Sequence, residues 1–169
     1  MKLYLKFKEE LEKLGGEVYS FKDLEDILKF LKRKIEEENI KKVALARLDK
    51  FLEEKLYSFL KNYVEVVKAS EIGEDVDMGI TGCDLALANT GSIVYSCERE
   101  EERLVTALPN THIIILSLDK IAEDLEDSIE FLSKRSVTFI TGPSKTADIL
   151  GQIIMGAHGP RRVIALVLI

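Results

Sequence analysis

The sequence predicts an α/β fold with a largely parallel β-sheet. Short apolar runs suited to strands alternate along the chain with helical patterns of about ten or more residues. The last run, Val163–Ile169, is almost wholly apolar, which is typical of a strand covered on both faces. Apolar residues make up 46% of the 169 residues and charged residues 32%, so the chain can bury a core. No repeat, low-complexity tract or linker divides it, and we expect a single domain overall.

Residues 1–38 are expected to form helices that pack on an α/β domain formed by residues 39–169. The first helix is indicated by apolar residues at helical spacing and by a glycine pair that ends the pattern: Leu3, Phe7, Leu11, Leu14 and Gly15-Gly16. Ser20 is the expected N-cap of the second helix, with Asp23 as its capping-box partner. The inner face of that helix is expected to consist of Leu24, Ile27, Leu28, Leu31 and Ile35.

Strand patterns dominate after Asn39. The helical run Phe51–Leu60 interrupts them once, and a shorter helix is expected around Arg103. The expected strands are Val43–Ala46, Tyr63–Val67, Asp77–Thr81, Ile93–Tyr95, His112–Leu118, Val137–Thr141 and Val163–Ile169. Because helices separate many of these runs, we expect most strands to be parallel.

The composition disfavours several classes of protein. The net charge of −6 argues against nucleic-acid binding, which depends on a basic face. No apolar stretch approaches the roughly 20 residues that cross a bilayer, and the N-terminus lacks the apolar core of a signal peptide, so we expect a cytoplasmic protein. The two cysteines, Cys83 and Cys97, form no C-x-x-C pair and are expected to be buried thiols. We expect no metal site and no cofactor in this chain.

Three segments rich in glycine and small polar residues adjoin the apolar runs: Gly79–Ser92, Thr141–Ile149 and Gly156–Arg162. In the second, a strand ends at Gly142-Pro143 and a helix is expected to begin near Ser144. Free N–H groups at such a helix start favour an anion, and Ser144, Lys145 and Thr146 would add donors. The spacing is not that of a P-loop. The alternative is that Ser144 only caps the helix, with Asp148 in its first turn.

The other two segments are similarly ambiguous. Asn89, Thr90, Gly91 and Ser92 either close a tight turn or line a cleft, where glycine allows a close backbone approach. His158 lies between glycines in a setting poorly suited to core packing. An exposed histidine there can exchange protons near neutral pH, which makes it our candidate general acid or base.

Histidine and arginine side chains elsewhere in the chain are further candidates for the same site. His112 opens an apolar strand, and a packed, hydrogen-bonded histidine is the usual outcome at such a position. Arg103 follows a run of glutamates, so it either forms a surface ion pair or binds a carboxylate through its two parallel N–H groups. Arg161 and Arg162 either close over an anion beside His158 or lie in water.

The order and spacing of these segments resemble the LUD domain family, and in particular lactate-utilisation proteins of the C type. The resemblance is carried by three blocks: GITGCDLALANTGS from Gly79 to Ser92, with Arg103 and Leu108-Pro109 after it; ITGPSKTADI from Ile140 to Ile149; and GAHGP from Gly156 to Pro160. It extends from about residue 40 to the C-terminus. Two positions depart from the family pattern. Asn89 stands where an acidic residue is frequent, and Lys145 stands where arginine is common. A carboxylate base at position 89 is therefore not expected. Lysine at position 145 keeps the positive charge of arginine but loses its two parallel N–H donors, so the change is more compatible with a general anion site than with two-point binding of a carboxylate.

The resemblance implies a three-layer, Rossmann-like domain similar to the CoA-transferase and ribose-5-phosphate isomerase superfamily. It also implies a part in the oxidation of L-lactate to pyruvate beside partner proteins that carry iron–sulfur clusters. A stand-alone isomerase or transferase acting on a sugar phosphate or CoA ester is one alternative, with His158, Asp84 or Asp148 as base. A non-catalytic scaffold subunit is another. The oligomeric state is left open, with a homo-oligomer as one alternative.

From these arguments we expect a small anionic metabolite to bind at the carboxyl ends of the strands. The expected ligand-binding residues are Asn89, Thr90, Gly91, Ser92, Arg103, Gly142, Pro143, Ser144, Lys145, Thr146, Asp148 and Gly159, with His158 as the candidate catalytic residue.

Overall fold

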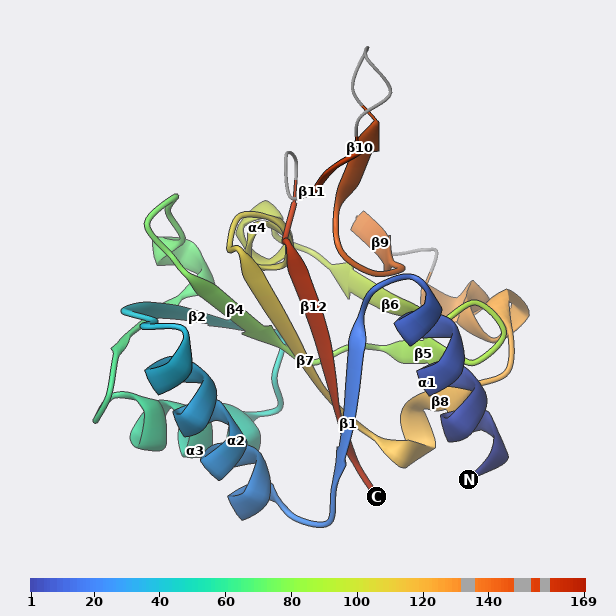
Figure 1. Ribbon diagram of the computed structural model, residues 1–169, viewed down its shortest axis with the longest axis horizontal. Helices are drawn as coiled ribbons and strands as arrows, with labels where there is room; N and C mark the ends of the chain where they lie inside the picture. Colours follow the sequence, from blue (N-terminus) through green and yellow to red (C-terminus); the bar gives the residue numbers. More distant parts are fainter. Residues whose placement is uncertain (132–135, 148–152, 156–158) are drawn as a thin grey trace.

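The computed structural model describes residues 1–131, 136–147, 153–155 and 159–169 and confirms the predicted α/β fold (Figure 1). The helices are α1 (Lys2–Lys13), α2 (Leu24–Glu37), α3 (Lys50–Leu60) and α4 (Glu100–Ala107), with short 3-10 turns η1 (Ala69–Glu71), η2 (Leu118–Lys120) and η3 (Leu125–Phe131). The strands are β1 (Glu17–Phe21), β2 (Lys42–Ala46), β3 (Glu65–Lys68), β4 (Met78–Thr81), β5 (Leu85–Leu87), β6 (Ser92–Cys97), β7 (Thr111–Ser117), β8 (Ile121–Ala122), β9 (Ser136–Ile140), β10 (Lys145–Ala147), β11 (Ile153–Met155) and β12 (Arg162–Leu168). Within the described helices, none combines the length and apolar character needed to cross a membrane.

The main sheet has six strands in the order β1-β12-β7-β4-β2-β3, and all of its pairs are parallel. The expected strands near residues 43, 63, 77, 112 and 163 all belong to it. β12 lies between β1 and β7 and is buried along five consecutive residues. This confirms the prediction that the apolar run at the C-terminus is a strand covered on both faces.

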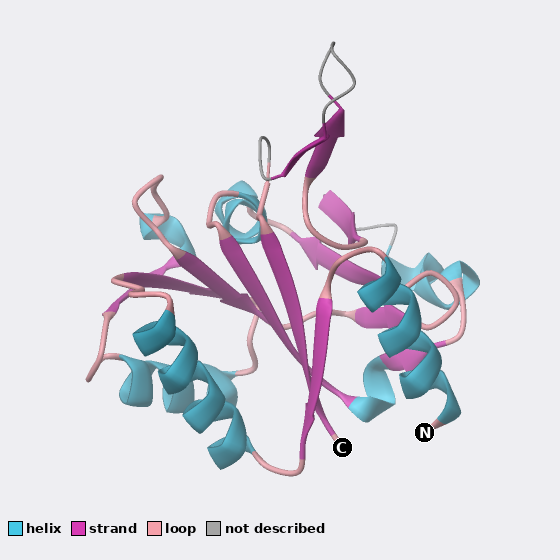
Figure 2. Ribbon diagram, in the orientation of Figure 1, coloured by secondary structure: helices cyan, strands magenta, loops and turns pink. Residues whose placement is uncertain are grey.

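Side chains that alternate along the strands divide the core between two faces of the main sheet. On one face, α2 and α3 pack against residues such as Val43, Ile113 and Ile164. On the other, α1 and the smaller sheet cover Ile114 and Val163, while α4 packs on the β2 side of the same face (Figure 2). The result is three layers, with helices on one side and a mixture of helices and strands on the other.

A smaller four-stranded sheet, in the order β8-β5-β6-β9, differs from the expectation of a largely parallel fold. The runs expected as strands near residues 93 and 137 lie here and pair antiparallel, with Ile93 opposite Ile140. Only a short turn separates β5 from β6, and so short a connection permits an antiparallel pair but not a parallel one.

The expectation that residues 1–38 are helical misses a strand. β1 extends the main sheet by pairing with β12, Val18 opposite Ala165. As a consequence, α2 begins later than Ser20: Asp23 is its N-cap, and the Asp23 carboxylate accepts a hydrogen bond of 2.9 Å from the Asp26 N–H. The N-terminal segment thus supplies an edge strand of the sheet as well as helices.

The helix expected to begin near Ser144 is not formed. Residues Lys145–Ala147 are instead strand β10, which pairs antiparallel with β11. The partner strand carries two isoleucines, a residue type that favours extended pairing. The helix N-terminus that would have supplied free N–H groups to an anion is therefore absent at this position.

The turn at Gly91 fixes the position of α1. Gly91 has a φ of +66°, and a Cβ atom at this residue would lie 2.4 Å from the backbone nitrogen of Leu11. We expect Gly91→Ala to lower the free energy of unfolding by about 2 kcal/mol or more, because the left-handed conformation and the collision with α1 both oppose a side chain. Urea denaturation measures the change.

Gly73→Ala is the matched control for Gly91→Ala. A Cβ atom there meets only the end of the Asp75 side chain, and Gly73 has no positive φ. This substitution should change the free energy of unfolding by less than about 0.5 kcal/mol. Equal losses in the two variants would contradict the close approach of α1 to the turn.

Candidate functional site

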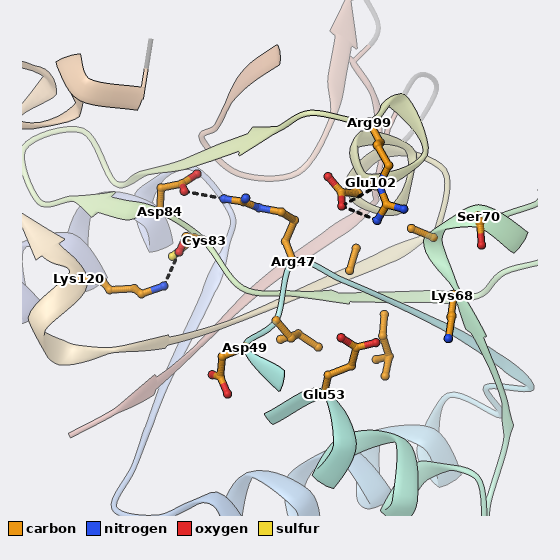
Figure 3. Close-up of a pocket in the computed structure, with 14 residues that line it drawn as sticks. Arg47, Asp49, Glu53, Lys68, Ser70, Cys83, Asp84, Arg99, Glu102 and Lys120 are labelled. Atoms are coloured by element: carbon orange, nitrogen blue, oxygen red, sulfur yellow. Dashed lines mark hydrogen bonds and ion pairs between the residues drawn. The ribbon is translucent and has the colours of Figure 1, made fainter. Parts of the chain in front are cut away.

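A pocket of about 610 Å³ lies at the carboxyl edge of the main sheet (Figure 3). The chain leaves β2 through α3 toward β3, whereas it leaves the neighbouring strand β4 through α4 toward β7, on the opposite side. Open α/β sheets place ligands at such a reversal of strand order. The residues that line the pocket are Leu45, Ala46, Arg47, Leu48, Asp49, Glu53, Lys68, Ala69, Ser70, Cys83, Asp84, Arg99, Glu102 and Lys120.

Arg47 directly follows β2 and points across the pocket (Figure 3). Its Nη2 atom donates to the Asp84 carboxylate at 2.6 Å and to the Ser96 hydroxyl at 3.5 Å. Arg47 has a φ of +53°, a left-handed conformation that is uncommon for a residue with a long side chain. Such strain is concentrated at functional sites, where the surrounding structure holds it in place.

Gly82 allows this geometry, since a Cβ atom on it would lie 2.5 Å from the Arg47 carbonyl oxygen. Asp84 follows Gly82 by two residues, and its second carboxylate oxygen accepts the Ser96 N–H at 2.6 Å. The Asp84 side chain is 10% exposed, so it acts as a fixed anchor for the guanidinium. Within the part of the chain that the structure describes, the Nε and Nη1 atoms of Arg47 form no hydrogen bond, although the guanidinium also lies 5.9 Å from the centre of the Tyr95 ring. Either nitrogen can donate to a carboxylate or phosphate group.

Lys120 supplies a second cation from the far side of the pocket. Its ammonium donates to the Cys83 carbonyl oxygen at 2.5 Å, and within the described residues it forms no ion pair. Burial raises the pKa of the neighbouring Cys83 thiol to about 12. The thiol is therefore protonated at neutral pH, and this cysteine is not poised as a nucleophile.

Carboxylates and cations face each other around the rim. Asp49 caps α3, its carboxylate accepting the Leu52 N–H at 2.9 Å, and Glu53 stands one turn further along the helix (Figure 3). Arg99 pairs with Glu102 at 2.8 Å. A pocket with this balance suits a small acid whose carboxylate meets Arg47 and Lys120 while a hydroxyl or keto group meets the opposite polar side chains.

Four of the sequence-predicted site residues meet in a different place. Arg103, Gly142, Ser144 and Gly159 line a hollow of about 190 Å³. Gly159 lies before the start of β12, and Ala107, at the end of α4, lies just before β7, so the hollow is at the amino edge of the sheet. The expectation that these residues gather at the carboxyl ends of the strands is wrong. Arg103 and Gly159 lie in segments that precede β7 and β12, which begin at the opposite edge. Gly142 and Ser144 follow β9 of the smaller sheet, and the Ser144 N–H donates to the Pro160 carbonyl oxygen at 2.8 Å.

The Asn89–Ser92 turn is engaged in structural contacts. Asn89 donates to the Asp124 carboxylate at 2.7 Å and accepts from Lys6 of α1. The Thr90 hydroxyl donates to the Ser92 hydroxyl at 2.8 Å, and that hydroxyl lies 2.9 Å from the hydroxyl of Thr141. These polar groups therefore hold the turn to α1 and to the end of β9.

The remaining predicted residues with described positions do not line the pocket at the carboxyl edge either. Lys145 donates to the Leu14 carbonyl oxygen at 2.6 Å, and thereby caps the C-terminal end of α1. Pro143 is buried, and Thr146 lies in β10. Arg103 pairs with Glu100 at the surface of α4. Asp148 and His158 lie outside the described residues.

His112 is packed and hydrogen-bonded, as expected for a histidine at the start of an apolar strand. It is fully buried on β7, and its Nε2 atom lies 2.9 Å from the Thr81 hydroxyl. Its Nδ1 atom has no hydrogen-bond partner among the residues that the structure describes. Both cysteines are buried free thiols, as the sequence predicted. Among the residues with described positions, no group of three or more potential ligands is placed to hold a metal ion.

Sequence reasoning considered Asp84 only as a possible base and missed Arg47 and Lys120. One signal was available, since Arg47 follows an expected strand directly, as Gly82-Cys83-Asp84 follows another. The carboxyl ends of two parallel strands meet at one edge, so residues that follow two strands are candidates for a common site. The spacing of these segments along the sequence does not indicate which strands are neighbours in the sheet.

Known proteins resemble this chain both in sequence and in fold. The protein named lactate utilization protein C from Anoxybacillus flavithermus is 31% identical over 94 residues, which cover 53% of this chain and 43% of that protein. Lactate utilization protein C 1 from Bacillus mycoides is 29% identical over 157 residues, covering 82% of this chain and 67% of that one. Most of the matched stretches thus amount to about half the length of the relatives.

The similarity in fold to a solved structure covers almost the whole chain. The crystal structure of a DUF162 family protein from Deinococcus radiodurans superposes with a TM-score of 0.70, over 99% of this chain and 96% of that one, at 16% sequence identity. In sequence, the family model of the LUD domain matches residues 4–168, which include α1, β1 and the last strand as well as the pocket residues. The chain therefore belongs to the LUD domain family.

Proposed function

We propose that this protein binds a small 2-hydroxy or 2-oxo carboxylate, of the L-lactate and pyruvate type, in the pocket at the carboxyl edge. The observation that carries the proposal is a pair of cations at a reversal of strand order: Arg47 is held by Asp84, and Lys120 is held by a carbonyl oxygen without an ion pair to any described residue. The relatives named lactate utilization protein C support the choice of acid.

In this proposal the chain is one component of a system that oxidises L-lactate to pyruvate. That oxidation removes two electrons and two protons from each lactate. The electrons pass to partner proteins that carry iron–sulfur clusters, the two protons pass to water, and this chain binds and orients the acid. The fixed position of Arg47 favours such a role, because a guanidinium already held by Asp84 can donate a charge-assisted hydrogen bond to a carboxylate without first losing side-chain freedom.

The hollow at the amino edge is the competing position for the same ligand, because it gathers Arg103, Gly142, Ser144 and Gly159. The carboxyl-edge pocket is favoured by electrostatics. Thr106 and Ala107, at the C-terminal end of α4, line the amino-edge hollow, and the carbonyl groups at a helix C-terminus oppose a negative charge.

Isothermal titration of the protein with L-lactate and pyruvate separates the two positions. We expect Arg47→Gln to weaken binding roughly 10- to 100-fold, the effect of losing a charged hydrogen bond, and Arg103→Gln to leave the affinity unchanged. Arg33→Gln, on the exposed surface of α2, is the matched control. Loss of binding in Arg103→Gln alone would place the acid at the amino edge, and a parent protein that binds neither acid would refute the proposal.

A further inference from the structure

A second hollow continues the pocket along the edge of the sheet. It has a volume of about 670 Å³ and lies beside α3 and the edge strand β3. Leu45, Glu53 and Lys68 line both hollows, so the two spaces share a boundary made of these three residues. The other residues of its lining are Lys50, Glu54, Tyr57, Val66, Val67 and Glu71.

The combined space is much larger than a three-carbon acid. Lactate has six non-hydrogen atoms, and at the volume of a water molecule for each, about 30 Å³, it fills about 180 Å³. The first hollow alone measures about 610 Å³. A ligand that occupies the whole site is therefore longer than lactate and extends from the Arg47 end toward Tyr57.

The two ends of the site differ in chemistry. Arg47 and Lys120 form the cationic end, whereas the ammonium groups of Lys50 and Lys68 in the second hollow form no hydrogen bond to a described residue. The second hollow instead contains the ring of Tyr57, which is 48% exposed, and the half-buried Val66. Lys61 lies 5.9 Å from the centre of the Tyr57 ring, an interaction that occupies one side of the ring. Exposed aromatic rings beside aliphatic side chains provide stacking platforms for planar groups.

We propose that the two hollows together bind a phosphate monoester that carries a planar heterocycle, that is, a mononucleotide. The phosphate binds Arg47 and Lys120, and the ring packs against Tyr57 and Val66. Sugar hydroxyls between them meet Glu53 and Lys68, which stand at the shared boundary. The inference rests on the proposed function only in that both ligands use the Arg47 end, so a mononucleotide and lactate compete for it.

The test measures the binding of adenosine monophosphate, flavin mononucleotide and ribose 5-phosphate to the intact protein by isothermal titration. We expect at least one of the two mononucleotides to bind about tenfold or more tightly than ribose 5-phosphate, which has the phosphate and the sugar but no planar ring. The two mononucleotides distinguish an adenine from a flavin ring. L-lactate should displace the bound mononucleotide.

Variants at the two ends separate the contributions. Tyr57→Ala should remove the advantage of the mononucleotide over ribose 5-phosphate and leave lactate binding unchanged, whereas Arg47→Gln should weaken all of these ligands. Phe51→Ala is the matched control, since this residue is an exposed aromatic of α3 that lines neither hollow. Lys120→Met tests the phosphate end independently if Arg47→Gln does not fold.

Two results would overturn the inference: mononucleotides that bind no better than ribose 5-phosphate, or a preference for them that survives Tyr57→Ala. Lactate binding that depends on Arg47 would in either case leave the proposed function intact. Conversely, mononucleotide binding that depends on both Tyr57 and Arg47, in a protein that binds neither lactate nor pyruvate, would support this inference and refute the proposed function.

Discussion

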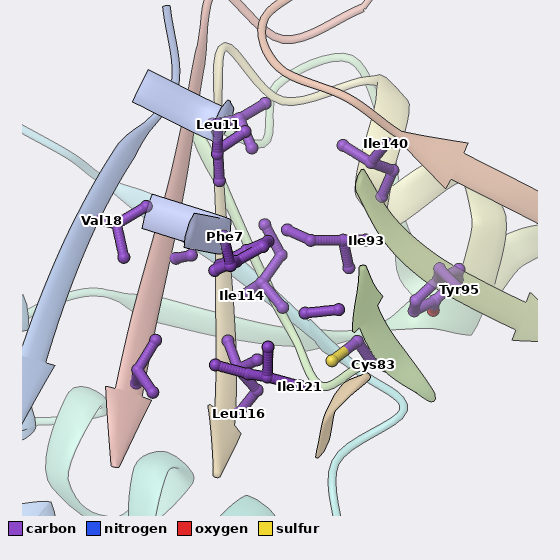
Figure 4. Close-up of a cluster of buried hydrophobic side chains, with 14 of the residues drawn as sticks. Phe7, Leu11, Val18, Cys83, Ile93, Tyr95, Ile114, Leu116, Ile121 and Ile140 are labelled. Carbon is purple, nitrogen blue, oxygen red and sulfur yellow. The ribbon is translucent and has the colours of Figure 1, made fainter. Parts of the chain in front are cut away.

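Replacing Phe7 with alanine should lower the free energy of unfolding by about 3–5 kcal/mol, the usual cost of removing a fully buried aromatic ring. Phe7 projects from α1 into the core cluster between the main sheet and the smaller sheet, near Ile114 and Ile93 (Figure 4). It has no exposed surface. The cavity left behind would lie where α1 and both sheets meet, so neighbouring side chains can fill little of it.

Leu5→Ala is the matched control for Phe7→Ala, because Leu5 is on the same helix and is 59% exposed. It should change the free energy of unfolding by less than about 0.5 kcal/mol. Chemical denaturation with an unchanged slope against denaturant concentration would assign the loss to stability itself. Similar small losses in both variants would show that α1 is not part of the folded core.

The second large effect concerns pH. Burial lowers the pKa of His112 from 6.5 to about 3, so the folded protein keeps this side chain neutral under mildly acidic conditions. The unfolded chain takes up a proton there below about pH 6.5. The contribution of His112 to stability is therefore complete above pH 6.5, and it falls by about 1.4 kcal/mol for each pH unit below this until the pH nears 3.

His112→Gln should flatten this acid dependence, because glutamine can keep a hydrogen bond to Thr81 and does not titrate. Between pH 6.5 and 4 we expect the parent to lose about 3 kcal/mol more of its free energy of unfolding than the variant loses. Denaturation series at several pH values measure the two slopes. Carboxylates and the second histidine, His158, are present in both proteins and cancel in the comparison. Parallel slopes would mean that His112 becomes charged in the folded state.

Local patterns predicted most of the helices and strands. The apolar spacing of α1 and the glycine pair after it indicated a helix that ends near Leu14, and the apolar run of β12 indicated a strand buried on both faces. The first strand was missed because Glu17–Phe21 is short, lies between two helical patterns and has one fully buried side chain, Val18. The strand β10 was missed because its extended form depends on pairing with β11, which lies further along the chain.

In the candidate site, too, local sequence patterns predicted some features, and the packing of distant segments decided others. The sequence alone determined the family resemblance, the two-sided burial of β12 and the small polar segments that adjoin strands. Only the tertiary structure decided which segments share an edge of the sheet. Arg47 meets Asp84, and Cys83 meets Lys120, across 37 residues in each case. Such pairs arise from the order of strands in the sheet, which depends on the packing of the whole chain and leaves no periodic signal in the residues themselves.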